Sequence, residues 1–66
     1  MRIFLNGEQI DCASGLTIAD LIQARNLPIE TILVECNGTA LRRRDWPSGK
    51  LSEGDRIEIL QVAAGG

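Results

Sequence analysis

The residues with the clearest potential for chemistry stand at the end of the sequence, where Ala63 and Ala64 are followed by Gly65 and Gly66. None of these side chains can add much to a core, and glycine has more backbone freedom than any other residue. We therefore expect residues 63–66 to form a flexible tail that can thread a narrow channel. Its one reactive group is the α-carboxylate of Gly66. Taken alone, the glycine pair favours a frayed end, because such short motifs often match by chance.

The side chains elsewhere offer little for catalysis. The sequence has two cysteines, Cys12 and Cys36, and no histidine, so the commonest general base is missing and a metal site would lack ligands. Both cysteines fall on the expected core face of a strand, where a thiol behaves as a small hydrophobe. We favour that interpretation over a role as sulfur acceptors. The sequence therefore predicts a protein that is not an enzyme and that holds neither a metal nor a bound cofactor.

Composition and charge narrow the class of protein. A chain of 66 residues makes one small domain, and its apolar content of 44% argues against disorder. A net charge of −2 argues against nucleic-acid binding, which needs a basic surface. No apolar run approaches the ~20 residues of a membrane span, and the first residues lack the apolar core of a signal peptide. We expect a cytoplasmic protein with no nucleic-acid or membrane partner.

Alternation of apolar and polar residues predicts the strands. The dipeptides Asn6-Gly7 and Asn37-Gly38 are strong hairpin signals, since both central positions of a type I′ turn need a positive φ. Each should join two antiparallel strands. Segment 42–47 is expected to be an irregular connection, which Leu51 anchors with Trp46 packed at its edge. The expected strands span residues 1–6, 8–12, 29–36, 39–41 and 56–62.

One short amphipathic helix is expected after the first hairpin. Thr17 is its expected N-cap, and Asp20 forms a weak capping box with it. Asn26 suits a left-handed position at the other end, and Pro28 prevents continuation. A helix of about two and a half turns is not stable alone. Its apolar face must therefore lie on the sheet, and that face comprises Ile18, Leu21 and Ile22.

Together these elements predict an α+β domain in which one main helix covers one face of a mixed four- to five-stranded sheet. We expect the last strand to lie in the middle of the sheet, beside the first strand and parallel to it. The tail would then project from a stiff strand, by roughly 13 Å if extended. The expected organisation is a compact domain at residues 1–62 and a flexible tail at residues 63–66.

Three apolar residues are expected on the sheet face away from the helix, close together and beside the base of the tail: Phe4, Leu60 and Val62. Scattered apolar residues are normal on protein surfaces. An apolar cluster is typical of an interaction site, and we favour a docking patch for partner proteins. The basic run at residues 42–44 could steer an acidic partner, although a solvated loop is the favoured interpretation.

The whole pattern resembles the ubiquitin-like β-grasp family and, within it, the sulfur carrier proteins of thiamine biosynthesis. The resemblance rests on the opening Ile-Phe-Leu-Asn-Gly, on Cys-Ala-Ser-Gly-Leu-Thr-Ile before the helix, on Trp46, and on Gly54-Asp55-Arg56-Ile57-Glu58-Ile59. Its most specific feature is the ending Gln-Val-Ala-Ala-Gly-Gly directly after a β-grasp pattern. These observations together favour a functional tail over a frayed end.

The resemblance implies that other proteins charge the tail. An adenylyltransferase related to ubiquitin-activating enzymes would use ATP and Mg²⁺ to adenylate the Gly66 carboxylate. Sulfur from a cysteine desulfurase or another donor would displace AMP and leave a thiocarboxylate, which thiazole synthase would use to build the thiazole ring of thiamine. Ala63 and Ala64 would extend the arm, while Gly65 and Gly66 would fit a constricted channel.

Two other classes of function remain open on the sequence. Sibling carriers share the fold and the tail: the small subunit of molybdopterin synthase, and thiocarboxylate donors for tRNA thiolation or amino-acid synthesis. A plain β-grasp interaction module would use its glycines for nothing covalent. ATP-dependent adenylation of Gly66 would separate a carrier from such a module, and rescue of a thiamine auxotroph would separate the thiamine carrier from its siblings.

Overall fold

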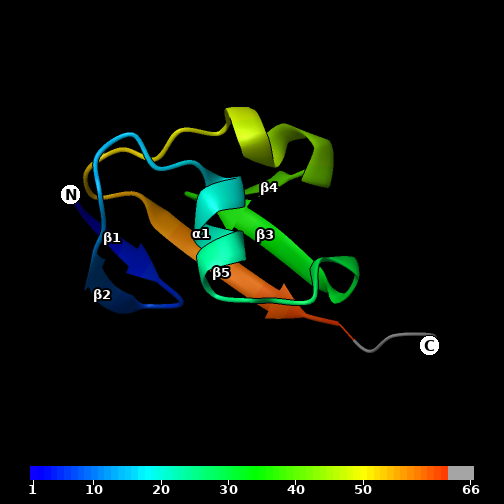
Figure 1. The fold of residues 1–66 in the computed structure, drawn as a ribbon. Helices are drawn as coiled ribbons and strands as arrows, with labels where there is room; N and C mark the ends of the chain where they lie inside the picture. The colour runs from blue at the N-terminus through cyan, green and yellow to red at the C-terminus, as the bar shows by residue number, and fades with distance from the viewer. Residues whose placement is uncertain (63–66) are drawn as a thin grey trace.

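The computed structural model of the protein describes residues 1–62, and the predicted tail at residues 63–66 lies outside them. The described chain forms a five-stranded sheet with one main helix on one face (Figure 1), which confirms the expected α+β architecture. The division into a domain and a tail stays a prediction. With η marking a 3₁₀ helix, the elements are β1 (Arg2–Leu5), β2 (Glu8–Asp11), α1 (Ile18–Ala24), η1 (Ile29–Thr31), β3 (Ile32–Cys36), β4 (Thr39–Leu41), η2 (Arg43–Ser48) and β5 (Arg56–Gln61).

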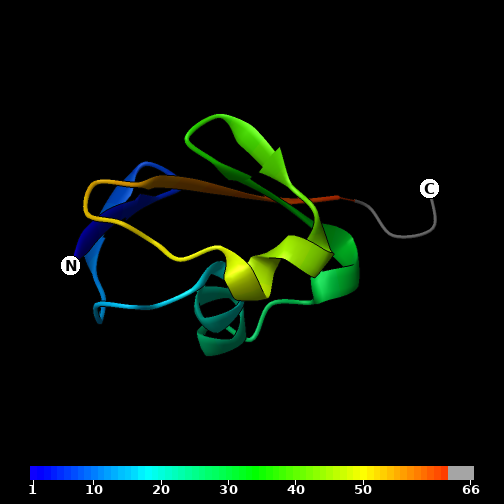
Figure 2. The ribbon, with the colours of Figure 1, turned by 90° about the horizontal axis from the view of Figure 1, so that it is seen from above.

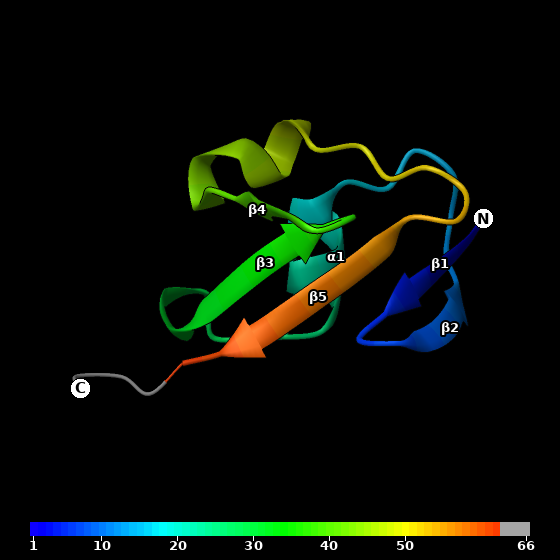
Figure 3. The same cartoon turned by 180° about the vertical axis from the view of Figure 1, so that it is seen from behind.

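The last strand, β5, occupies the middle of the sheet, whose strand order is β2-β1-β5-β3-β4. It runs parallel to β1 and antiparallel to β3, as Figure 3 shows. The hairpins β1–β2 and β3–β4 supply the outer strands. The prediction that the last strand lies beside the first and parallel to it is confirmed. Because parallel neighbours cannot be joined by a tight turn, the chain between them crosses one face of the sheet, and α1 forms part of that crossing.

Both predicted hairpin turns have the expected left-handed backbone. The φ angles are 50° at Asn6 and 81° at Gly7, and 53° at Asn37 and 85° at Gly38. Paired positive φ angles define the type I′ turn, whose twist matches that of the flanking strands. Asparagine enters this region more readily than most residues, so the two dipeptides set both turns locally.

Helix α1 is capped at both ends. The N–H of Asp20 donates to Oγ1 of Thr17, and the N–H of Thr17 donates back to Oδ2 of Asp20, each at 3.1 Å. The predicted capping box is therefore complete. At the other end Asn26 has a φ of 53°, and the N–H of Leu27 donates to the carbonyl of Ile22. This Schellman-type end satisfies carbonyls of the last turn, and the predicted apolar face is buried.

The expected strand at residues 29–36 is wrong over its first three residues, which form the 3₁₀ helix η1. The cause is local, because the N–H and the hydroxyl of Thr31 both donate to the carbonyl of Pro28, at 2.9 and 3.0 Å. Those bonds close a tight turn that an extended strand could not make. Pairing with β5 begins only at Ile32, opposite Gln61.

The connection after β4 is also more regular than predicted, since it contains the 3₁₀ helix η2. The N–H of Asp45 donates to the carbonyl of Arg42 at 2.9 Å, and the N–H of Gly49 donates to that of Trp46 at 3.2 Å. This helix turns the indole of Trp46 inward, where the residue is 4% exposed, into the same core cluster as the anchor Leu51, which is 6% exposed. The predicted packing of this segment is confirmed.

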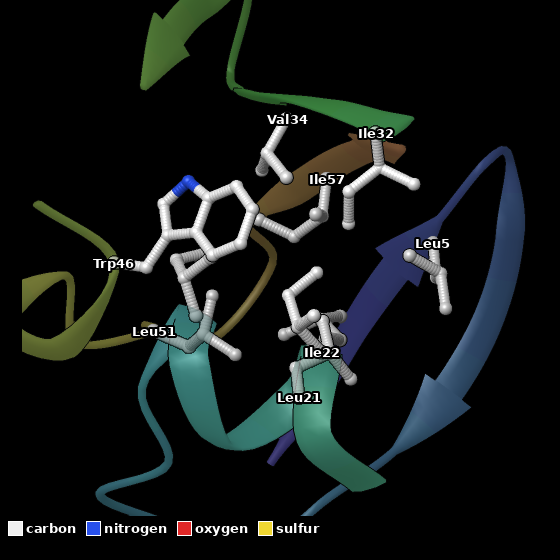
Figure 4. Packing of buried hydrophobic residues seen from close by; sticks show 10 residues of the cluster. Leu5, Leu21, Ile22, Ile32, Val34, Trp46, Leu51 and Ile57 are labelled. Carbon is white, nitrogen blue, oxygen red and sulfur yellow. The ribbon is translucent and has the colours of Figure 1, made fainter. Parts of the chain in front are cut away.

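The hydrophobic core lies between the sheet and the layer that α1 and η2 form beside it (Figure 2). In Figure 4 the Trp46 ring faces Val34 of β3 and Ile57 of β5. Each fully buried side chain of this kind contributes about 1.5–3 kcal/mol relative to an exposed one. The helix-side face of β5 is therefore anchored in the core. The buried apolar residues are Ile3, Leu5, Ile18, Leu21, Ile22, Ile32, Val34, Trp46, Leu51 and Ile57.

Candidate functional site

The end of β5 is the point from which the chain continues into the predicted tail. Strand β5 pairs with β3 from Ile57 through Gln61. The N–H of Val62 extends this ladder by donating to the carbonyl of Thr31 at 2.7 Å. On the other side, pairing with β1 stops at Ile57, because β1 ends at Leu5. Val62, the last described residue, is thus bonded to the chain on the β3 side only, through Thr31.

Two asparagine side chains hold β5 where neighbouring strands do not. Asn6 binds Ile59 with both ends of its amide: Oδ1 accepts from the N–H at 2.7 Å, and Nδ2 donates to the carbonyl at 3.3 Å. At the start of β5, Oδ1 of Asn37 accepts from the N–H of Arg56 at 2.9 Å, and Nδ2 donates to Oδ1 of Asp55 at 3.1 Å. Each turn asparagine therefore provides a positive φ and also braces the central strand. The sequence signalled only the positive φ.

Figure 3 looks onto the open face of the sheet, the face opposite α1. The predicted docking residues Leu60, in β5, and Val62, just after it, fall on this face because they alternate with residues such as Ile59 that pack against the core. Leu60 is 47% exposed and Val62 is 42% exposed. Leu33 of β3 lies directly opposite Leu60 and is 55% exposed. We call Leu33, Leu60 and Val62 the open-face patch. Sequence reasoning missed Leu33, because alternation placed it on this face but could not supply the register that brings it to Leu60.

The expectation that Phe4 lies close to Leu60 and Val62 is wrong. In the parallel pairing of β1 with β5, Phe4 is opposite Arg56, four residues before Leu60. At about 3.3 Å per residue, this separates Phe4 from Leu60 by about 13 Å along the strand. Phe4 does share the open face, since both of its chain neighbours are buried in the core, but it is only partly exposed. A partner contact at Phe4 stays a prediction.

The two cysteines are half-buried free thiols that pack against the core, which confirms their predicted core position. Burial, with a smaller effect from the carboxylate of Asp55, raises the pKa of Cys36 above its ordinary value. The thiolate is the reactive form of cysteine. A raised pKa therefore makes Cys36 a poor nucleophile at neutral pH, which favours the core role over that of a sulfur acceptor.

The remaining sequence candidates lie outside the open-face patch. The basic residues 42–44 are exposed around the start of η2. Arg43 and Trp46 line a groove of about 530 Å³ beside the end of α1, a groove that includes no patch residue. Within residues 1–62, no group of three or more His, Cys, Asp or Glu side chains could hold a metal ion. No helix in that range is long and apolar enough to cross a membrane.

The predicted tail residues, Ala63, Ala64, Gly65 and Gly66, lie outside the described residues, so their role stays a prediction. What the structure establishes is the base from which they continue. That base is a braced central strand, and the open-face patch lies beside its last residues.

Comparison with known proteins covers nearly the whole chain. Residues 3–66 match the family model described as the ThiS family. The sulfur carrier protein ThiS of Escherichia coli (strain K12) is 29% identical over 66 residues, which is 100% of both chains. The crystal structure of the thiamine biosynthesis protein (ThiS) from Geobacter metallireducens has a TM-score of 0.85 at 30% identity and also covers 100% of both chains. The described fold is accordingly the ubiquitin-like β-grasp.

A further relative is much longer than this chain. A protein named thiazole synthase, from Magnetococcus marinus, is 32% identical over 66 residues. The match covers 100% of this chain and 20% of that protein. A segment like the present chain is therefore one part of a larger polypeptide there.

Proposed function

The chain belongs to the ThiS family, and from that premise we propose that it acts as the sulfur carrier of thiamine biosynthesis. The observation that carries the proposal is the extent of the family match, which includes the central strand β5 and also Gly65 and Gly66. In this role the protein is a carrier on which other enzymes act, and not an enzyme itself. Its place of work is the cytoplasm, where those enzymes are expected.

The proposed chemistry takes place at the α-carboxylate of Gly66. A carboxylate resists nucleophiles until one oxygen becomes part of a good leaving group. An adenylyltransferase related to ubiquitin-activating enzymes therefore binds ATP and Mg²⁺, and the carboxylate oxygen bonds to the α-phosphorus as pyrophosphate leaves. A cysteine desulfurase persulfide then attacks the acyl carbon and AMP leaves. A second thiol then attacks the desulfurase cysteine sulfur of the resulting acyl disulfide, forms a disulfide with that cysteine and releases the thiocarboxylate. The ATP and Mg²⁺ belong to the partner, so the carrier needs no bound cofactor.

In this reaction the folded domain serves as the surface that the partner enzymes bind. Because β5 is braced by β3 and by the side chain of Asn6, its end has a defined position relative to the open-face patch. A partner that binds the patch thereby also positions the base of the tail. Positioning of this kind converts a chance encounter into an effectively intramolecular step. The arm beyond it, from Ala63 to Gly66, then needs only to reach the reacting centre.

Thiazole synthase is the proposed acceptor of the sulfur. In Magnetococcus marinus a segment similar to this chain forms part of a protein named thiazole synthase. Covalent linkage of two proteins raises their effective concentration for each other, and such a linkage is useful when the two act together. This relative therefore supports thiazole synthase as a partner and favours the thiamine role over the sibling sulfur-transfer pathways.

The test is intact-mass analysis of the full chain after incubation with the adenylyltransferase, ATP, Mg²⁺ and a sulfur donor. We expect one oxygen of the chain to be replaced by sulfur. Gly65→Val should block this exchange, because a β-branched side chain would obstruct the channel that we propose for the tail, while the melting temperature stays unchanged. Ala63→Val adds comparable bulk farther from the carboxylate and should still be converted. Normal exchange in Gly65→Val would refute the steric argument, and no exchange in the wild type would refute the carrier function.

A further inference from the structure

Two carboxylates face each other across the open face of the sheet. Glu35 of β3 is paired directly with Glu58 of β5, and the Cβ atoms of such opposed residues lie about 4.5–5.5 Å apart. Within residues 1–62 the ion pair that forms joins Arg2 to Asp11 and includes neither glutamate. Arg56 shares this face by alternation, two residues before Glu58, and among residues 1–62 it forms no ion pair with either glutamate. Like charges placed directly opposite one another destabilise a sheet.

This acidic pair adjoins the open-face patch. The next pair of the same two strands on this face is Leu33 with Leu60, one repeat of about 6.6–7 Å away. On the other side of Glu35, its partner in β4 is the small, exposed residue Ala40. On the open face the two carboxylates therefore have an apolar pair next to them along the strands and a small, exposed residue beside Glu35 in the edge strand β4.

We propose that Glu35 and Glu58 together bind one arginine side chain of the adenylyltransferase, flanked on that enzyme by apolar residues that cover Leu33 and Leu60. The proposal rests on the carrier function and specifies its docking chemistry. A guanidinium group is planar, permanently charged and has five donors, so it can serve both carboxylates at once. Its arrival converts a repulsive pair into charge-assisted hydrogen bonds. The unfavourable pair in the free protein thus becomes a source of partner specificity.

The charge pattern argues against other occupants of this face. A second copy of the chain packed through the same face in a two-fold dimer would bring two acidic pairs together, since such interfaces are self-complementary. Nucleic acids and anionic membrane surfaces would be repelled by the same carboxylates. A partner site that places a cation beside apolar residues complements both the glutamates and the leucines.

The test measures KM and kcat for the carrier in adenylation by the adenylyltransferase, followed by pyrophosphate release. Glu35→Gln and Glu58→Gln should each raise KM about tenfold, the effect expected when a hydrogen bond to a charged group is weakened, with kcat unchanged. Both variants should melt higher than the wild type, by about 1–5 °C, because the repulsion is removed. The matched control is Glu8→Gln, which makes the same charge change at an exposed position on the edge strand β2.

The outcomes separate the docking proposal from the function on which it rests. Unchanged KM in both glutamine variants, with the wild type adenylated normally, would overturn the arginine proposal and leave the carrier function standing. An equal rise of KM in Glu8→Gln would also overturn the arginine proposal, since the effect would then be one of net charge. Self-association of the wild type, seen by sedimentation and altered in both glutamine variants but not in Glu8→Gln, would assign the face to a second copy and overturn the arginine proposal. A wild type that is never adenylated would refute the function and the named partner together.

Discussion

Asn6 is predicted to stabilise the fold through its side chain, beyond its contribution to the turn. Its amide makes both a 2.7 Å and a 3.3 Å hydrogen bond to the backbone of Ile59, across 53 positions of sequence. The informative change is Asn6→Gly, because glycine adopts a φ of 50° without strain. The substitution therefore leaves the turn intact and removes only the two bonds to β5.

The magnitude follows from those two bonds. A neutral hydrogen bond contributes about 0.5–1.5 kcal/mol net, so the pair contributes about 1–3 kcal/mol. Both bonds are solvent-exposed, and water can partly replace them, so we expect a loss of about 1–2 kcal/mol. For a domain of this size each kcal/mol shifts the melting temperature by about 4–8 °C. The expected fall is therefore about 5–15 °C, a large share of the ~3–5 kcal/mol that such a small core provides.

Urea denaturation followed by the fluorescence of Trp46 measures this loss, because it is the single tryptophan and is buried in the core. The matched control is Asn26→Gly. Asn26 has nearly the same φ, 53°, but its side chain makes no hydrogen bond within residues 1–62. We expect the Asn26 variant to change the free energy of unfolding much less. Equal effects of the two substitutions would refute the bracing role, since only the shared loss of an asparagine at positive φ would then count.

Two further predictions concern side chains that pack in the core or against it. Because burial raises the pKa of Cys36, the stability gained from its neutral thiol is present at neutral pH and is lost as the pH rises through that raised pKa. Alkylation of Cys36 at neutral pH should therefore be slow in the native protein and faster in urea. Rapid labelling of the native protein would contradict this. Trp46→Phe should lower the free energy of unfolding by only roughly 1–2 kcal/mol, measured by circular dichroism in urea, because Nε1 of Trp46 has no hydrogen-bond partner among the described residues. Trp46→Ala should lower it by about 3–5 kcal/mol. Similar losses in both variants would show that the indole is specifically required.

Much of the local structure follows from residues that are neighbours in the sequence. The Asn-Gly dipeptides predict both hairpin turns, since the positive φ that each turn needs depends only on the two residues at its centre. Thr17 and Asp20 predict the start of α1, because the capping box spans only one turn. The errors at residues 29–31 and 42–47 arise where turns depend on local hydrogen bonds, between residues close in the sequence, that alternation does not report. The bonds from Thr31 to the carbonyl of Pro28 are examples.

The candidate site was predictable only in part. Alternation correctly placed Leu60 and Val62 on the exposed face, and resemblance to a known family pointed to the last four residues. Leu33 was not found and Phe4 was wrongly grouped with Leu60, because both questions depend on how far one strand slides along another. A shift of two residues preserves every inward and outward assignment while moving a side chain by about 7 Å.

The sequence by itself determined most element types and the faces of the strands, because these depend on local backbone preferences and on periodicity. Its likeness to known sequences, which is a separate kind of evidence, determined the family. Only the tertiary structure decided which residues meet across strands: Leu33 with Leu60, Glu35 with Glu58, and Asn6 with Ile59. The physical reason is that register is chosen by the packing of the whole core against the sheet, a sum over contacts between residues far apart in the chain.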